Sequence, residues 1–175
     1  DRIIFAGVEF MGESAKILNP KKRVFMPDMN ADCPMAHMAD KDEILALREK
    51  YDDIAVVCYI NSTAELKKYS DVCVTSSNAV KIVKNLPNKN IFFIPDRNLG
   101  SYVAKQCPDK NFIFNNGCCP RHVVITKDMV LKAKELHPEA RFAAHPECTE
   151  DVLAFADYVG STSGIIDYVV DTDAD

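Results

Sequence analysis

Two cysteines, Cys33 and Cys119, lie 86 positions apart, and several polar residues repeat at the same interval. The other pairs with this spacing are Tyr59 with His145, Asn61 with Glu147, and Ser76 with Thr162. A fixed internal period indicates copies of one structural unit. If the copies surround a common axis, equivalent side chains converge there, and one thiolate from each copy could hold a metal centre.

The remaining cysteines allow other interpretations. Cys58, Cys73, Cys107 and Cys148 have the pattern of small apolar core residues. Cys118 could be a variable neighbour of Cys119, the ligand in its place, or its partner in a vicinal disulfide. Seven cysteines without a CxxC pair favour metal-binding or free thiols in a reducing cytoplasm over a secreted disulfide framework.

Composition excludes several classes of partner. The formal net charge is −5 at pH 7, and 47% of the residues are hydrophobic. Because the chain has no basic stripe, nucleic acid and anionic membrane surfaces are poor candidate partners. The longest apolar runs have the length of strands, so we expect no membrane span and see no signal peptide.

Short apolar segments alternate with amphipathic ones along the chain. The predicted strands are Ile3–Val8, Arg23–Met26, Ile54–Ile60, Val72–Thr75, Ile91–Ile94, Asn111–Phe114 and Arg141–Ala144. The predicted helices are Met11–Leu18, Lys41–Tyr51, Ala64–Tyr69, Asn78–Leu86, Leu99–Gln106, Lys127–His137 and Glu150–Phe155. This alternation predicts an α/β fold with parallel sheets covered by helices on both faces, in three-layer α/β/α units.

The period also predicts the division of the chain. We expect residues 1–53 to be the later part of a first domain, 54–139 a complete second domain, and 140–175 the start of a third. Because the sequence begins without Met and directly on an apolar strand, we interpret it as an internal piece of a longer protein.

Polar residues follow the predicted strands, at the edge of a parallel sheet where functional groups gather. Tyr59 and Asn61 follow one strand, and His145 and Glu147 follow another. The hydroxyl clusters 75–77 and 161–163 precede helix starts, where backbone N–H groups favour anions. They could be plain N-caps, but two clusters in register favour a site. Asp96, after Pro95, is expected to be a structural N-cap.

Several longer segments together resemble one known family. They are FAGVEFMGESAKILNP, PDMNADCPMA, YINSTAE, TSSNAVKIV, PDRNLGSYVAKQ, NGCCPRH, AHPEC and YVGSTSG. Over nearly the whole chain the sequence resembles quinolinate synthase. The resemblance implies three pseudo-threefold-related α/β/α domains around a [4Fe–4S] cluster. It implies condensation of iminoaspartate with dihydroxyacetone phosphate to quinolinate in NAD biosynthesis, in the cytoplasm, with a functional link to aspartate oxidase.

The resemblance also implies roles for individual residues. Cys33 and Cys119 match cluster ligands, and the third ligand is expected beyond residue 175. The implied substrate contacts are Tyr59, Asn61, Ser76, His145, Glu147, Ser161 and Thr162, with Glu147, Tyr59 and His145 catalytic. Three thiolates leave one iron of a cubane open to act as a Lewis acid. With two of the three thiolates, this chain alone is expected to be inactive.

Two rival functions use the same residues. A zinc-dependent hydrolase or lyase could use Cys33, Cys119 and a histidine, although zinc sites usually take two ligands from one short loop, and each loop here offers one cysteine. A non-catalytic anion-binding α/β module would explain the hydroxyl clusters but not the matched cysteines. His122 could line the pocket or brace the loop that holds Cys119.

Overall fold

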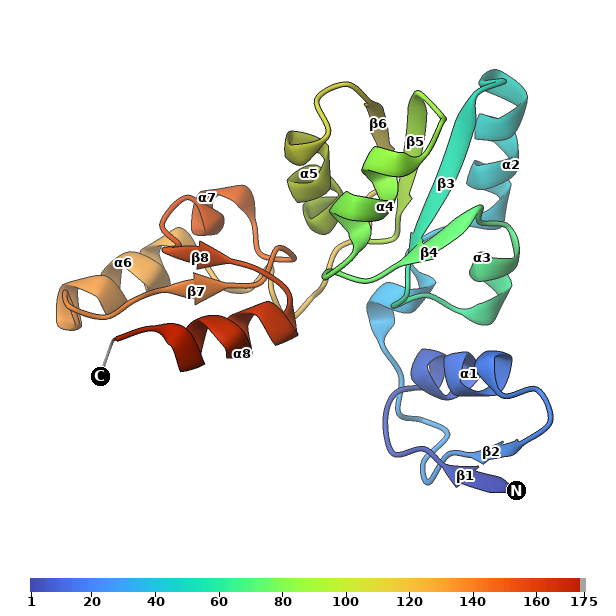
Figure 1. Ribbon diagram of the computed structural model, residues 1–175, viewed down its shortest axis with the longest axis horizontal. Coiled ribbons are helices and arrows are strands. Elements are labelled where there is room, and N and C mark those ends of the chain that lie inside the picture. The colour runs from blue at the N-terminus through green and yellow to red at the C-terminus, as the bar shows by residue number, and fades with distance from the viewer. Residues whose placement is uncertain (174–175) are drawn as a thin grey trace.

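The computed structural model describes residues 1–173 and contains three separate parallel sheets. Figure 1 shows them as three lobes that follow one another along the chain. The first lobe contains β1 (Arg2–Ile4), α1 (Glu9–Leu18) and β2 (Arg23–Phe25). A short 3₁₀ helix, η1 (Pro34–His37), leads from it into the central lobe.

The central lobe is the largest, and its sheet has the strand order β4-β3-β5-β6 with every pairing parallel. Its elements are α2 (Lys41–Lys50), β3 (Ile54–Tyr59), α3 (Ala64–Lys68), β4 (Val72–Val74), α4 (Ala79–Asn85), β5 (Asn90–Ile94), α5 (Arg97–Gln106) and β6 (Asn111–Phe114). Parallel neighbours need a crossover connection, and the helices supply it.

Strand β3 is buried on both faces, and all six of its residues are buried. Val57 and its odd-numbered neighbours pack in one hydrophobic cluster with residues of α4 and α5. Val56 and its even-numbered neighbours pack in a second cluster that includes Ile44 of α2 and Leu66 of α3. Successive strand residues point to opposite faces, so the central lobe is a three-layer α/β/α unit.

The third lobe is smaller and less enclosed. It contains α6 (Lys127–Leu136), β7 (Ala143–Ala144), α7 (Glu150–Leu153), β8 (Tyr158–Val159) and α8 (Thr162–Asp171). Its hydrophobic cluster centres on Val130 of α6, Val152 of α7 and Cys148. None of the residues of α8, all of which the structure describes, is buried.

The interval of 86 residues recurs in the pairing of strands. Val57 pairs with Val72 between β3 and β4, and Ala143 pairs with Tyr158 between β7 and β8. Helices α2 and α6 are also related by this interval, since they span Lys41–Lys50 and Lys127–Leu136. Tyr59 ends β3, and His145 directly follows β7. The sequence period therefore corresponds to equivalent positions in two lobes.

A hydrogen-bonded aspartate repeats at the same interval. The backbone N–H of Val56 donates to Asp71 Oδ2 over 2.7 Å, and Arg48 pairs with the same carboxylate at 2.9 Å. In the third lobe the N–H of Phe142 donates to Asp157 Oδ2 over 2.7 Å. Lys134, which matches Arg48, pairs with Asp157 at 3.3 Å. Each aspartate thus ties the start of its lobe's first strand to the preceding helix.

The predicted fold class, α/β with parallel sheets and alternating helices, is confirmed. Strand β8 was not predicted, and of helix α8 only the start at the hydroxyl cluster 161–163 was expected. The strand expected over Ile3–Val8 ends at Ile4. The domain boundaries after residues 53 and 139 stay predictions. Because α2 and α6 pack into the lobes that follow them, each boundary could equally precede the helix. Across residues 1–173, no helix has the length and apolar character to cross a membrane.

Candidate metal centre and active-site cavity

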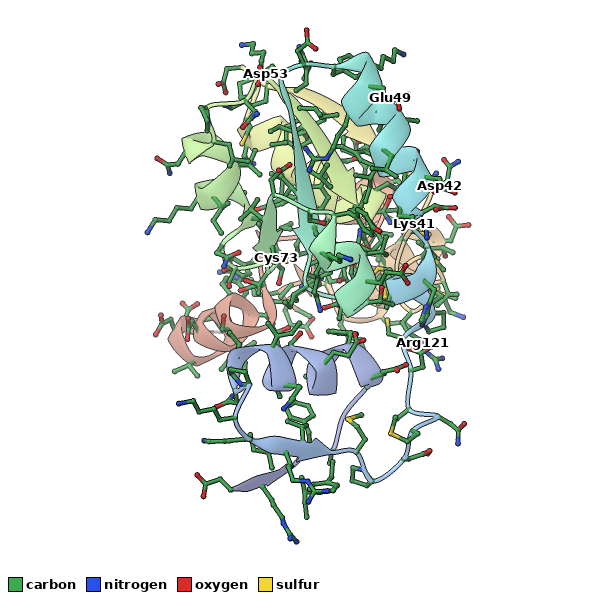
Figure 2. All side chains as sticks on the ribbon, turned by 90° about the vertical axis from the view of Figure 1, so that its right-hand side faces the viewer. Lys41, Asp42, Glu49, Asp53, Cys73 and Arg121 are labelled. Atoms are coloured by element: carbon green, nitrogen blue, oxygen red, sulfur yellow. The ribbon has the colours of Figure 1, made fainter. Side chains whose placement is uncertain are left out.

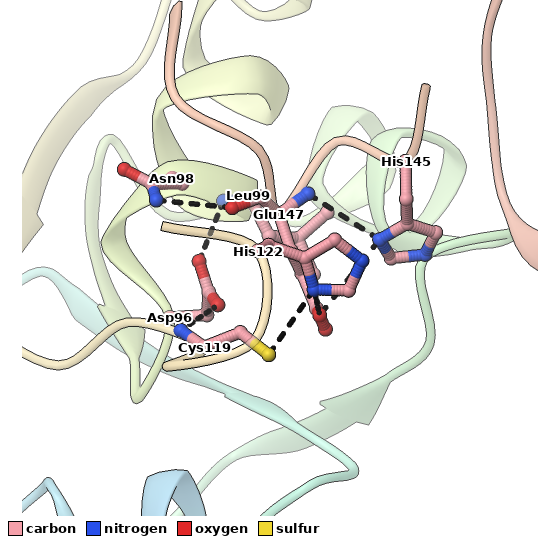
Figure 3. A network of polar contacts seen from close by, with 7 residues as sticks. All are labelled: Asp96, Asn98, Leu99, Cys119, His122, His145 and Glu147. Atoms are coloured by element: carbon pink, nitrogen blue, oxygen red, sulfur yellow. Dashed lines mark hydrogen bonds and ion pairs between the residues drawn. The ribbon is translucent and has the colours of Figure 1, made fainter. Parts of the chain in front are cut away.

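Asp96 fixes the loop that contains Cys119. Its Oδ1 accepts a hydrogen bond from Leu99 N at 2.9 Å and caps α5, while Oδ2 accepts from Cys119 N at 3.0 Å (Figure 3). The side chain is fully buried. Burial raises the pKa of Asp96 to about 6, although the backbone N–H donors act in the opposite direction. The predicted capping role is confirmed, and the same carboxylate also positions Cys119.

His122 lies between the Cys119 thiol and the Glu147 carboxylate. Its Nδ1 is 3.1 Å from Cys119 Sγ and 2.8 Å from Glu147 Oε2. The hydrogen bond with Cys119, followed by that with Glu147, raises the pKa of His122 to about 10. Ligand atoms of these three residues all lie within 4.8 Å of one another. A thiolate, an imidazole and a carboxylate at this spacing could hold a metal ion.

Glu147 is buried and held from several sides. Asn98 Nδ2 donates to its carbonyl oxygen over 3.0 Å, and its own N–H donates to His145 Nδ1 over 3.3 Å. Burial alone would raise the pKa of Glu147, but hydrogen bonds from His122 and Tyr59 outweigh it and lower the pKa. Among the described residues, Glu147 Oε1 has no partner. The carboxylate is therefore ionised at neutral pH with one oxygen free for a ligand.

His145 is the neutral member of the group. Burial lowers its pKa, although the Glu147 charge opposes this effect. Since Nδ1 accepts the N–H of Glu147, the neutral ring has its proton on Nε2. The rings of His122 and His145 are tilted, with centroids 5.2 Å apart. The two histidines thus differ in charge at neutral pH.

A cavity of about 450 Å³ lies where the central and third lobes meet. It is lined by Tyr59, Asn61, His122, His145, Glu147, Thr162, Ile165 and Ile166. Burial and the nearby Glu147 charge raise the pKa of Tyr59, while a hydrogen bond with Ser76 opposes the shift. Tyr59 therefore stays protonated, with Ser76 beside it. The cavity brings together residues from the ends of two strands and the start of α8.

Cys33 lies at the start of η1 and packs against the same hydrophobic cluster as Cys119. Its N–H donates to Asp32 Oδ1 over 2.7 Å. Burial raises the pKa of the Cys33 thiol, hydrogen bonds from Ala36 and Met35 lower it, and the Cys119 charge raises it further. The two thiols therefore lie close enough to interact electrostatically.

The three predicted hydroxyl residues of the site have different surroundings. Ser161 Oγ caps α8 by accepting a hydrogen bond from Gly164 N at 3.2 Å, and it lies 3.1 Å from Ser163 Oγ. Ser161 is absent from the described residues that line the cavity, whereas Thr162 lines it. Ser76 lies beside Tyr59. Ser161 thus caps α8, and its predicted role in substrate binding stays a prediction.

His122 is the candidate site residue whose role the sequence left open. Its signal was the spacing in NGCCPRH, three residues after Cys119. Cys119 and His122 come from the same loop, with Sγ and Nδ1 3.1 Å apart, so this loop offers a possible second ligand beside its matched cysteine. Only the structure shows that Glu147 joins them from the third lobe.

The cysteines include one correction. All seven lie within residues 1–173 and are free, so the vicinal disulfide is not formed here. Cys58, Cys107 and Cys148 are buried as predicted. Cys73 is exposed, and its predicted core position was wrong, because β4 is an edge strand of the central sheet.

Comparison with known proteins gives a consistent result. The family described as "Quinolinate synthetase A protein" matches residues 1–175. A quinolinate synthase of Fusobacterium nucleatum is 61% identical over 168 residues, which is 96% of this chain and 56% of that protein. The quinolinate synthase of Caldicellulosiruptor saccharolyticus is 54% identical over 174 residues, covering 99% of this chain and 57% of that protein. The chain thus spans little more than half the length of these relatives.

Proposed function

Because the chain belongs to the Quinolinate synthetase A protein family, we propose that its cavity is part of a quinolinate synthase active site. The proposed reaction condenses iminoaspartate with dihydroxyacetone phosphate to quinolinate, with release of phosphate and water. The observation that carries this proposal is the convergence of Cys119, His122 and Glu147 at the edge of the cavity. A buried carboxylate with a free oxygen suits a substrate that must lose protons.

The proposed cofactor is a [4Fe–4S] cluster held by Cys33, Cys119 and a third cysteine beyond residue 175. Two thiols that pack in one hydrophobic cluster and interact electrostatically fit such a group, because iron–sulfur clusters are held by thiolates. With three protein ligands, the cluster would supply a Lewis-acidic iron with an open position. Cys118 remains the alternative ligand.

The residues that line the cavity are proposed to have different roles in the reaction. Glu147, ionised and with no hydrogen-bond partner for Oε1 among the described residues, is proposed to take protons from substrate carbon. Tyr59 stays protonated and donates a hydrogen bond, and His145 donates from Nε2. Asn61, Ser76 and Thr162 offer neutral polar groups to phosphate and carboxylates, and Ser161 is proposed to assist through the start of α8.

The wider proposals rest on the family. Residues 1–53, 54–139 and 140–175 would belong to three successive domains of a longer enzyme. The proposed partners are the two small-molecule substrates, with a functional link to aspartate oxidase as a source of iminoaspartate. We further propose a cytoplasmic location.

The test is anaerobic purification of the full-length protein followed by assay with both substrates. The proposal expects a brown protein with iron and sulfide in equal amounts that forms quinolinate. A protein that contains both elements and forms no quinolinate would overturn the proposed reaction. The protein without iron should form no product, which controls for the uncatalysed reaction.

A mononuclear metal centre is the second candidate. The observation that favours it is that Cys119, His122 and Glu147 bring one sulfur, one nitrogen and one oxygen within 4.8 Å of one another. Three protein ligands with an open position are typical of catalytic zinc. Metal analysis separates the candidates, because stoichiometric zinc without sulfide would support a hydrolase or lyase.

A further inference from the structure

Cys58 and Cys73 face each other across two neighbouring strands, away from the metal centre. They are partners in the parallel register of β3 and β4, and β4 is the edge strand of the central sheet. Register partners in neighbouring strands point to the same face, with a strand spacing of about 4.8 Å. Disulfides usually join Cα atoms roughly 4.4 to 6.8 Å apart. The two cysteines therefore lie within bridging distance.

The two thiols differ in access and in acidity. Cys58 is fully buried, whereas Cys73 is exposed, and Figure 2 labels Cys73 on the central lobe. A hydrogen bond from Cys58, aided by the Lys67 charge, lowers the pKa of Cys73 to about 7. The same hydrogen bond and burial raise the pKa of Cys58. Near neutral pH, Cys73 is thus an accessible partial thiolate with a protonated thiol beside it, and the thiolate is the reactive form.

We propose that Cys58 and Cys73 form a reversible disulfide, with a low-molecular-weight disulfide such as oxidised glutathione as the oxidant. The Cys73 thiolate attacks one glutathione sulfur, forms a mixed disulfide and releases one glutathione thiolate. Cys58 then gives up its proton, attacks the Cys73 sulfur and releases the second glutathione thiolate. Two electrons pass from the cysteine pair to the glutathione disulfide, which leaves as two reduced molecules.

The bridge would join the two strand ends that carry cavity residues. Cys58 directly precedes Tyr59, and the backbone of Ile60 donates to Val74 O over 2.8 Å. Ser76 follows β4 and interacts with Tyr59. Cys73 is exposed, and exposed disulfides are more easily reduced than buried structural ones. Oxidation should therefore be reversible and should affect the neighbouring cavity residue Tyr59.

The third lobe offers an internal control. At the same interval of 86 residues, Ala144 and Val159 replace the two cysteines and are paired in the same register. The third lobe therefore shows a pair of side chains without thiols that fits this strand pairing. The double variant Cys58→Ala/Cys73→Val copies this pair into the central lobe and leaves the proposed cluster ligands unchanged.

The experiment treats the purified full-length protein with oxidised glutathione and maps its peptides by mass spectrometry without reduction. We expect a peptide pair linked through Cys58 and Cys73, which disappears after excess reduced glutathione. Cys58→Ser should instead accumulate glutathione on Cys73, because the second step lacks its nucleophile. Cys107→Ser, at a buried cysteine outside the pair, should bridge like the unmodified protein, and the Ala/Val variant should not bridge.

Two results would overturn the proposal. One is stable glutathione on Cys73 of the unmodified protein without a bridge, and the other is no modification of either cysteine. If Cys58→Ser fails to fold, as judged by circular dichroism, Cys73→Ser at the exposed position replaces it and should abolish the bridge.

Discussion

The central and third lobes share local structure but differ in burial. Their first strand pairs have the same register. In each lobe an aspartate accepts a backbone hydrogen bond at or beside the first strand and pairs with a basic side chain of the preceding helix. Yet Ala79 and Val83 of α4 are buried, whereas no residue of α8, the helix at the equivalent position and described in full, is buried. Register and turns therefore follow from local sequence, while burial depends on how many strands and helices surround the pair.

The two lobes also place different chemistry at equivalent positions. Tyr59 and Asn61 follow β3, while His145 and Glu147 follow β7, and all four line one cavity. Asn61 cannot ionise, whereas Glu147 is a buried carboxylate whose pKa is lowered. This contrast supports the proposal that one lobe provides mainly binding groups and the other provides proton transfer.

The largest expected effect comes from the third lobe's carboxylate. Glu147→Gln should lower turnover by about 10² to 10⁴, because the amide cannot accept a proton in general base catalysis. Asn61→Ala should mainly raise KM, since Asn61 is a neutral contact. Steady-state assays of the full-length enzyme separate kcat from KM. A turnover number of Glu147→Gln within a few-fold of that of the unmodified enzyme would contradict the proposed division of roles between the lobes.

A second comparison concerns the cores of the two lobes. Ile44 and Val130 occupy equivalent positions on α2 and α6, in clusters of unequal size. Ile44→Ala should cost about 2 to 5 kcal/mol, and Val130→Ala about 1 to 2 kcal/mol at roughly 0.8 kcal/mol per buried CH₂. Hydrogen exchange should quicken across the central lobe in the first variant and only in the third lobe in the second. Equal losses of stability in the two variants would contradict the difference in burial between the lobes.

The smallest effect concerns the repeated aspartate. The Phe142 N–H, then the Lys134 side chain, lowers the pKa of Asp157 below its ordinary value of 3.8. A lowered folded-state pKa adds stability that is present above pH 3.8 and disappears as the pH falls through the folded pKa. Asp157→Asn should therefore unfold more easily than the unmodified protein at pH 7, with the difference shrinking towards pH 3. Thermal unfolding at both pH values measures it, and a difference that grows in acid would refute the linkage.

Much of the fold could be predicted, because strand patterns and the period are local signals. The buried run of β3 and the turn before α5 were read from the sequence. A helix start was expected at the hydroxyl cluster 161–163, where α8 begins. Its extent was not predicted, since its run of β-branched residues also fits a strand. The exposure of Cys73 depends on β4 being an edge strand, which sequence pattern does not reveal. The contact of His122 with Glu147 joins two lobes and needs tertiary structure.

The central claim is that Cys119 binds the metal centre of a shared cavity, and iron content tests it most directly. Cys119→Ala and Cys118→Ala change adjacent cysteines of the same loop, so the second variant is a matched control. After anaerobic reconstitution of the full-length protein, we expect Cys119→Ala to lose its iron and sulfide and Cys118→Ala to keep most of both. Iron retained in Cys119→Ala and lost in Cys118→Ala would contradict the account.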